Sequence, residues 1–364
     1  MKSRRIGILT SGGDCSGLNS AIRATYIRAK QLGYDLIGIT RGLRGLAKDE
    51  PSYVALNDQL CGDSMLTSGG SILYSDTKFM ASTVESGISV ADARKALSNG
   101  YKKLGLDGLI CVGGDGSVQL INELLNDNED LRIVVIPKTI DNDVSGTDLA
   151  IGFQTSVEVV VSAVENIIST AKSHERAMVV EVMGRGAGHI AINAGLSSGA
   201  DVILVPEFKY DIEKVKSKVM SCFNGEKNYC IIIVAESVEA SGFKHKEEVI
   251  DGVVKYTHVV YGGIGQHLVN RIKETGIDSR CVTLGHIQRG GKTSVIDRTL
   301  GTMFGVEAVN LIDENNCGKL LCYVNNKICA IDIRDFVRNP TKTLTRDDVY
   351  VRIAKQMGVY IGET

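Results

Sequence analysis

The chain has 364 residues, of which 43% are hydrophobic and 23% charged, and its formal net charge is −2. This is the composition of a folded globular protein, and it excludes a disordered chain. The charge argues against nucleic acid as a partner, because proteins that bind it usually carry a basic excess. Glycine is frequent, with 40 residues against 4 prolines and no collagen-like period. We therefore expect many tight turns, or places where the backbone closely approaches a ligand.

The hydropathy and cysteine patterns predict a cytoplasmic protein. No apolar stretch reaches the roughly 18 residues of a membrane helix, and no signal-peptide-like apolar segment follows the basic N-terminus. We therefore expect no membrane partner. The nine cysteines are dispersed and form no C-x-x-C pair, a pattern typical of reduced cytosolic thiols.

Short apolar runs alternate with longer helical patterns along the chain. We expect strands at residues 6–10, 36–40, 108–112, 132–136, 178–182, 201–205 and 229–235, and helices at 19–32, 157–171 and 210–223. Runs rich in Val and Ile that are separated by helices indicate parallel sheets covered on both faces. The prediction is an α/β fold of two doubly wound lobes with largely parallel sheets. Residues 238–265 are less regular, and we expect them to form loops and short strands.

Two glycine-rich turns each follow a predicted strand and precede a helix. The first is Ser11-Gly12-Gly13-Asp14, and the second is Gly113-Gly114-Asp115-Gly116-Ser117. In doubly wound folds, phosphates bind at helix N-termini beside the carboxyl ends of strands, so the two turns could cradle one polyphosphate. Either turn alone is equally well explained as an ordinary strand-to-helix connection. The motifs of P-loop enzymes and of dinucleotide-binding dehydrogenases are absent, which disfavours both classes.

An acidic segment, Pro137-Lys138-Thr139-Ile140-Asp141-Asn142-Asp143, directly follows the strand expected at 132–136. Its two aspartates could have different tasks at a strand end. One could accept a proton from an attacking hydroxyl, while the other binds Mg²⁺ together with Asp115, since Mg²⁺ prefers carboxylate and phosphate oxygens. The alternative interpretation is a solvated acidic turn.

Basic residues follow later strands in the same way. They lie in Met183-Gly184-Arg185 and in Gly285-His286-Ile287-Gln288-Arg289-Gly290-Gly291, with Arg176 and Arg280 nearby in the sequence. Guanidinium groups form bidentate, charge-assisted hydrogen bonds with phosphate. Four arginines and a histidine at strand ends or glycine turns therefore predict a pocket for a sugar phosphate.

Taken together, in this order along nearly the whole chain, these motifs resemble the 6-phosphofructokinase family. The resemblance implies transfer of the terminal phosphoryl group of a donor to O1 of fructose 6-phosphate, which gives fructose 1,6-bisphosphate. It implies that Asp141 is the general base and that Asp115 and Asp143 bind Mg²⁺. The catalytic set would also include Thr139 and Arg185, beside the transferred phosphoryl group, and Lys138.

The resemblance also implies where the two substrates and a second subunit bind. The sugar-phosphate contacts would be Met183, Gly184, Glu236, His286 and Arg289, and the donor contacts Gly13, Lys78, Gly116 and Ser117. Arg176 and Arg280 resemble two arginines that the family contributes from the adjacent subunit. The active unit would then be at least a homodimer with shared sites, with a tetramer as the alternative.

The same resemblance divides the chain into segments. Residues 1–150 would form the donor lobe and 151–288 the fructose 6-phosphate lobe. Residues 289–340 would return to the donor lobe, and 341–364 would form a C-terminal helical segment.

The choice of donor depends on two residues. Gly116 is typical of family members that use ATP, because an Asp there would place a negative charge where the α-phosphate passes. Lys138 is typical of members that use pyrophosphate. The glycine controls entry sterically, so we expect ATP as the donor, with pyrophosphate as the alternative. Two other functions fit the residues less well, a NAD or lipid kinase and a non-catalytic sugar-phosphate-binding subunit. A NAD or lipid kinase would leave most of these motifs without a role, and a non-catalytic subunit would not need Asp141.

Overall fold

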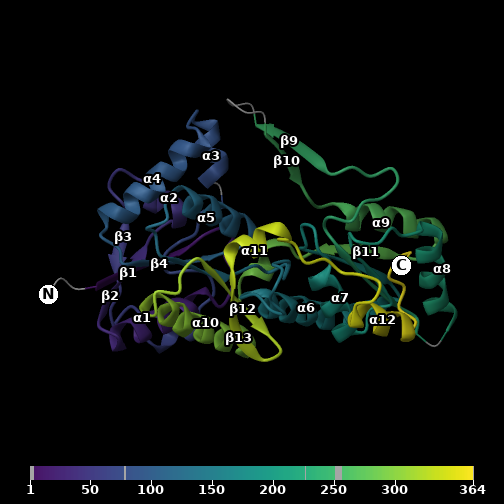
Figure 1. Cartoon of the computed structure of the whole chain (residues 1–364). Coiled ribbons are helices and arrows are strands. Elements are labelled where there is room, and N and C mark those ends of the chain that lie inside the picture. The colour runs from purple at the N-terminus through teal and green to yellow at the C-terminus, as the bar shows by residue number, and fades with distance from the viewer. Residues whose placement is uncertain (1–3, 78, 226, 251–255, 364) are drawn as a thin grey trace.

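Residues 4–77, 79–225, 227–250 and 256–363 are described by the computed structural model (Figure 1). A seven-stranded sheet has the order β13-β12-β5-β4-β1-β2-β3. Its strands are β1 (Arg4–Thr10), β2 (Tyr34–Ile39), β3 (Tyr53–Ala55), β4 (Gly108–Gly113), β5 (Ile133–Pro137), β12 (Lys319–Val324) and β13 (Lys327–Asp332). All adjacent pairs are parallel except the two edge pairs, β2–β3 and β12–β13.

Alternate side chains of the central strands enter two different hydrophobic clusters. In β4, Ile110 and Val112 pack in one cluster, and Leu109 and Cys111 pack in the other. The first cluster is covered by α1 (Leu18–Gln31) and α10 (Val295–Asp313), and the second by α2 (Gly42–Leu46), α4 (Val90–Lys103), α5 (Asp115–Asp127) and α11 (Ile333–Arg338) (Figure 1). Burial on both faces explains why these strands are continuous apolar runs in the sequence.

A second, four-stranded sheet has the order β11-β6-β8-β7 and is parallel throughout. Its strands are β6 (Ala177–Val182), β7 (Val202–Leu204), β8 (Cys230–Ala235) and β11 (Ser279–Thr283). The helices of this part are α6 (Phe153–His174), α7 (His189–Ser198), α8 (Ile212–Asn224), α9 (Ile264–Ile272) and α12 (Val349–Gln356). In Figure 1 the two sheets and their helices lie next to each other, with β12 and β13 beside the N-terminal strands. The predicted fold class is confirmed.

The irregular segment predicted at 238–265 contains β9 (Lys246–Ile250) and β10 (Tyr256–Val260), an antiparallel pair. This agrees with the expected excursion of loops and short strands. In Figure 1 the pair faces α3 (Phe79–Glu85) across the top of the molecule. None of the described helices combines the length and apolar character that a membrane crossing requires. The division of the chain into lobes at the boundaries given above stays a prediction.

Asp297, in the first turn of α10, determines where α6 begins. Its carboxylate is fully buried and accepts hydrogen bonds from the backbone N–H groups of Gly152 at 2.9 Å and Thr155 at 2.7 Å. It also accepts from the hydroxyls of Thr155 at 2.5 Å and Ser294 at 3.2 Å. The free N–H groups of a helix N-terminus are thereby satisfied by another helix. This explains why α6 starts at Phe153, whereas the local apolar pattern predicts a helix that starts at residue 157.

Replacing Asp297 with Ala should lower the free energy of unfolding by about 3 kcal/mol or more, because several buried donors lose their acceptor. Chemical denaturation monitored by circular dichroism measures this change. Asp211 provides a matched control, since it caps α8 through the N–H of Glu213 at 2.9 Å but is exposed. Asp211→Ala should cost only about 1 kcal/mol. Equal costs for the two variants would contradict the role given to Asp297.

Candidate active site

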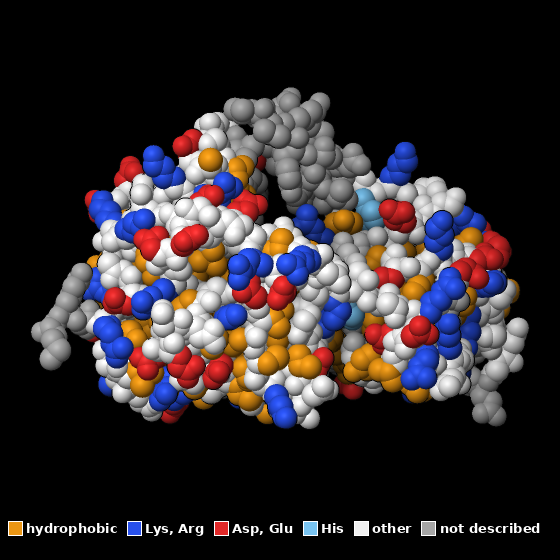
Figure 2. All heavy atoms as spheres, in the orientation of Figure 1, with side chains coloured by type: hydrophobic (Ala, Val, Ile, Leu, Met, Phe, Trp, Pro, Cys, Tyr) orange, Lys and Arg blue, Asp and Glu red, His pale blue; other side chains and the backbone are white. Residues whose placement is uncertain are grey.

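A cavity of about 970 Å³ lies at the carboxyl ends of β1, β4 and β5 and extends to residues of the second sheet. Because these three strands are neighbours and parallel, the loops that follow them meet at one edge of the sheet. Acidic and basic side chains are interspersed on the face of the molecule seen in Figure 2. The cavity brings together many of the residues singled out in the sequence: Gly13, Asp115, Gly116, Ser117, Lys138, Thr139, Asp141, Asp143, Arg185, His286 and Arg289.

Asp141 is the most perturbed carboxyl group of the cavity. Burial, together with the nearby charge of Asp143, raises its pKa to about 7. The guanidinium of Arg289 and the backbone N–H of Arg185 oppose this shift. A carboxylate with a pKa close to neutral can both hold and release a proton at physiological pH, which is the property that a general base needs.

Asp143 and Asp115 form an acidic pair beside Asp141. Burial and the charge of Asp115 raise the pKa of Asp143, and the hydroxyl of Thr139 donates a hydrogen bond to Asp143 Oδ1 at 3.0 Å. Asp115 is the first residue of α5, where the helix N-terminus borders the cavity. Two carboxylates and a neighbouring hydroxyl are all oxygen ligands, the donor set that Mg²⁺ prefers. The residues present therefore fit a magnesium ion.

The two glycine-rich turns lie side by side. The hydroxyl of Ser117 donates to that of Ser11 at 2.9 Å, which joins the turn after β4 to the turn after β1. A Cβ atom at Gly113 would lie 2.5 Å from that of Ser117, so only glycine allows this packing. A Cβ atom at Gly116, in contrast, would meet nothing within 4 Å. Position 116 is therefore open, and packing within the protein does not require glycine there.

Lys138 is buried at the floor of the cavity. Its ammonium group donates to the carbonyl of Gly13 at 2.5 Å, and burial lowers its pKa. Its side chain thus fastens the first glycine turn to the end of β5.

Arg289 reaches the same turn from the second sheet. Its guanidinium donates to the carbonyl of Asp14 at 3.1 Å, and a Cβ atom at Gly13 would collide with it. The same group acts on the pKa of Asp141. Arg289 therefore lies between the predicted donor loop and the predicted base, rather than only in the sugar-phosphate region where the sequence analysis expected it.

Met183, Gly184 and Glu236 lie just behind Arg185. The N–H of Met183 donates to Gln288 at 3.2 Å, and the carbonyl of Gly184 accepts from Ser237 at 2.5 Å. The N–H of Gly184 bonds to Glu236, whose pKa is raised by burial and whose charge acts on Asp141. These three residues do not line the cavity, but they lie next to residues that do.

Arg176 and Arg280 lie away from the cavity and share one partner. Arg176 Nε donates to Asp278 at 2.6 Å, and Arg280 pairs with the other oxygen of the same carboxylate. The hydrogen bond from Arg176 and the charge of Arg280 lower the pKa of Asp278. No motif in the sequence singles out Asp278, although it lies two residues before Arg280. Lys78, predicted to contact the donor, lies outside the described residues.

The cavity also has an apolar wall, formed by Leu43, Phe79, Met80, Val90 and Leu120. Tyr261 and Thr341 line it as well, and Thr341 is placed there by a β-bridge to Val144. The sequence analysis did not name Phe79, Met80, Tyr261 or Thr341 as site residues. They belong to no motif, and only the folded chain brings them next to the glycine turns.

Replacing Asp143 with Asn should lower the pKa of Asp141 below its value of about 7, because one neighbouring negative charge is removed. Carbon-13 NMR titration of labelled aspartate carboxyl groups measures this shift. Glu236→Gln is the matched control and should cause a smaller decrease, since Glu236 acts more weakly on Asp141. An unchanged midpoint in Asp143→Asn would show that burial alone sets the pKa.

Comparison with known proteins agrees with this geometry. A family model described as Phosphofructokinase matches residues 5–312. The protein named ATP-dependent 6-phosphofructokinase 1 from Nostoc sp. (strain PCC 7120) is 40% identical over 366 residues, covering 100% of this chain and 99% of that protein. The pyrophosphate–fructose 6-phosphate 1-phosphotransferase of Dictyoglomus thermophilum is 37% identical over 334 residues, covering 92% of this chain and 93% of that protein.

Among solved structures, the T-state phosphofructokinase of Pichia pastoris superposes with a TM-score of 0.78 at 27% sequence identity. That match covers 93% of this chain but 36% of the much longer yeast chain. The family model and the full-length relatives support the same assignment as the arrangement of the cavity. The chain belongs to the phosphofructokinase family.

Proposed function

We propose that the protein is a 6-phosphofructokinase that transfers the terminal phosphoryl group of ATP to O1 of fructose 6-phosphate. The observation that carries this proposal is the position of Asp141. Its buried carboxylate, with a pKa raised to about 7, lies on the cavity wall with the glycine turns, the acidic pair, Arg185 and His286. A base between a phosphate-binding edge and basic residues suits phosphoryl transfer to a sugar hydroxyl. A non-catalytic binding subunit would not need such a base.

In the proposed reaction, Asp141 accepts the proton of the sugar 1-hydroxyl as O1 forms a bond to the terminal phosphorus of the donor. The bond from that phosphorus to the bridging oxygen breaks, and the nucleoside diphosphate leaves. Arg185 stabilises charge on the transferred group, Thr139 lies beside that group, and Lys138 holds the turn of Gly13 in place. Such positioning and electrostatic effects account for most of the catalysis in phosphoryl transfer. The sugar phosphate would be oriented by His286 and Arg289, with Met183, Gly184 and Glu236 next to them.

Asp115 and Asp143 would hold Mg²⁺. When bound, the ion would neutralise part of the negative charge of the phosphates. The hydroxyl of Thr139, which donates to Asp143 at 3.0 Å, orients one of the two carboxylates for this task.

ATP is the donor that the cavity suits best. The position of a Cβ atom at Gly116 is open, so the first turn of α5 leaves room for a chain of phosphates. The apolar wall of Leu43, Phe79, Met80, Val90 and Leu120 adjoins the same cavity. A nucleoside would bury its base against such a wall, whereas pyrophosphate has no apolar part to bury.

Pyrophosphate is the second candidate donor, and Lys138 is the residue that favours it. Its buried ammonium lies next to the first glycine turn, where it could also meet a phosphate. In the described structure this group is already bonded to the carbonyl of Gly13, which weakens the argument. The donor assay below decides between the two.

We further propose a homodimer or larger assembly with shared sites in the cytoplasm. Arg176 and Arg280 carry positive charge outside their own cavity, and Asp278 holds both guanidinium groups together. A second subunit would use such a pair to bind the phosphate of its sugar substrate. Size-exclusion chromatography with light scattering tests the assembly.

Purified protein with fructose 6-phosphate and Mg²⁺ should turn over with ATP and much less with pyrophosphate, in a coupled assay of fructose 1,6-bisphosphate. Gly116→Asp should reduce ATP turnover about a hundredfold or more, because a carboxylate near a phosphate costs several kcal/mol at an effective dielectric of about 20. Gly116→Ala is the control, since its Cβ would meet no protein atom. It should keep most of the activity.

Two results would contradict ATP as the donor. One is turnover with pyrophosphate only, and the other is an equal effect of Asp and Ala at position 116. The family assignment would stand in either case.

Asp141→Asn should reduce kcat by about 10²–10⁴-fold, because the base is lost, and should leave sugar-phosphate binding measurable by calorimetry. For the unmodified protein, kcat/KM should fall about tenfold per pH unit below about 7, as Asp141 becomes protonated and can no longer accept a proton. The profile must be corrected for the substrate phosphate, which titrates near pH 6. Asp130→Asn, an exposed site on the same lobe, is the control. Unchanged turnover in Asp141→Asn would remove it from the role of base.

A further inference from the structure

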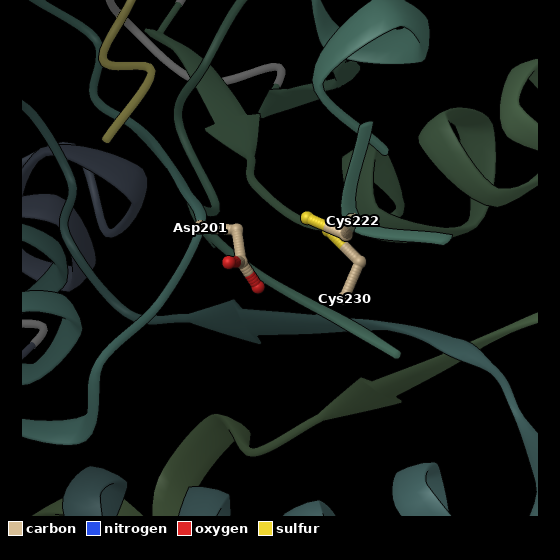
Figure 3. A group of neighbouring side chains, drawn as sticks. All are labelled: Asp201, Cys222 and Cys230. Atoms are coloured by element: carbon tan, nitrogen blue, oxygen red, sulfur yellow. The ribbon is translucent and has the colours of Figure 1, made fainter. Parts of the chain in front are cut away.

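A cluster of Asp201, Cys222 and Cys230 lies outside the lining of the cavity, directly before β7, in the last turn of α8 and at the start of β8 (Figure 3). One side-chain oxygen or sulfur atom from each residue lies within 4.8 Å of the other two. Figure 3 shows the two sulfur atoms beside each other, with the carboxylate of Asp201 facing them. Such a group could bind a metal ion, or the two thiols could react with each other.

The contacts of Asp201 argue against a metal ion. Its two carboxylate oxygens each accept a hydrogen bond from the ammonium of Lys227 at 2.7 Å. The N–H of Ile231 donates to one of them at 2.9 Å. The carboxylate therefore already has a cation, and a divalent ion would have to be buried next to a second positive charge, which is costly.

We propose that Cys222 and Cys230 are a reactive thiol pair that a hydroperoxide converts into a reversible disulfide. The two thiols are close together, come from adjacent elements and differ in exposure. The side chain of Cys230 is completely buried, whereas Cys222 keeps 7% of its surface exposed. A small oxidant would therefore reach Cys222 first.

The electrostatic environment assigns the same order to the two thiols. Hydrogen bonding to Cys230 lowers the pKa of Cys222, although burial and the carboxylate of Asp201 act in the opposite direction. The same hydrogen bond, with burial, raises the pKa of Cys230. The thiolate is the form of cysteine that attacks peroxides, so Cys222 is the attacking residue and Cys230 the resolving one.

The chemistry needs only the peroxide as oxidant. The sulfur of Cys222 attacks one peroxide oxygen, the O–O bond breaks, and water or an alcohol leaves, which gives a sulfenic acid. The sulfur of Cys230 then attacks that sulfur, the S–O bond breaks, and the proton of the Cys230 thiol leaves with the oxygen as water. The chain has lost two hydrogen atoms, and a thiol reductant restores it.

The disulfide would leave the proposed active site intact. Cys230 is the first residue of β8, while Glu236 follows the opposite end of that strand. The crosslink would connect α8 to the end of β8 that lies away from the cavity, so turnover should be essentially unchanged on oxidation.

The purified protein, treated with hydrogen peroxide and digested with trypsin without reduction, tests the proposal by mass spectrometry. Trypsin cleaves after Lys227, between the two cysteines, so the disulfide joins two peptides that separate on reduction. We expect this linked pair to form about tenfold faster than Cys61 is oxidised, because a lower pKa gives more thiolate. Cys61 is a matched control, with 5% of its surface exposed and a pKa raised to about 11 by burial.

Two variants make the test specific. Cys222→Ser should abolish the linked peptides, and Cys230→Ser should leave a sulfenic acid on Cys222 that dimedone traps. Oxidation of Cys222 no faster than that of Cys61, or conversion to a sulfinic acid without the crosslink, would overturn the proposal. Stoichiometric zinc in the reduced protein that is lost in Cys222→Ser would also overturn it, because the thiols would then be metal ligands.

Discussion

The site depends on one buried carboxylate, that of Asp141. Burial disfavours its charge, and the neighbouring Asp143 disfavours it further, so its pKa lies near 7 instead of near that of a free aspartate. Arg289 and the backbone N–H of Arg185 oppose these effects and favour the charged form. Both of these residues come from the second sheet. The proton affinity of the base therefore depends both on the adjacent Asp143 and on residues that the second half of the molecule contributes.

Arg289 connects the second sheet to the first glycine turn at this site. Its guanidinium packs on Gly13 and donates to the carbonyl of Asp14, so the second sheet touches the turn that we assign to the phosphoryl donor. The ammonium of Lys138 binds the same turn at the carbonyl of Gly13. The two basic residues thus bind adjacent carbonyl groups of the glycine turn. The absence of a side chain at Gly13 is what allows the approach, which explains part of the glycine content.

Acidic residues organise the basic ones in the second sheet. Asp278 holds Arg176 and Arg280 at the same carboxylate, and Glu236 adjoins Arg185 through the N–H of Gly184. Guanidinium groups already fixed by a carboxylate lose less conformational entropy when they bind a phosphate. The carboxylate of Asp278 therefore holds both guanidinium groups in place before any ligand binds.

The sequence by itself determined the fold class, the positions of seven strands and three helices, and many of the residues that meet at the sheet edge. These features follow from local apolar periodicity and from motifs that directly follow strands, as with Asp141 after β5 and Gly116 after β4. Only the tertiary structure decided the early start of α6 on Asp297, the pairing of Asp278 with two arginines and the place of Thr341 beside the cavity. Each of these depends on groups far apart in the chain, and their hydrogen bonds, burial and charge interactions exist only once the chain is folded.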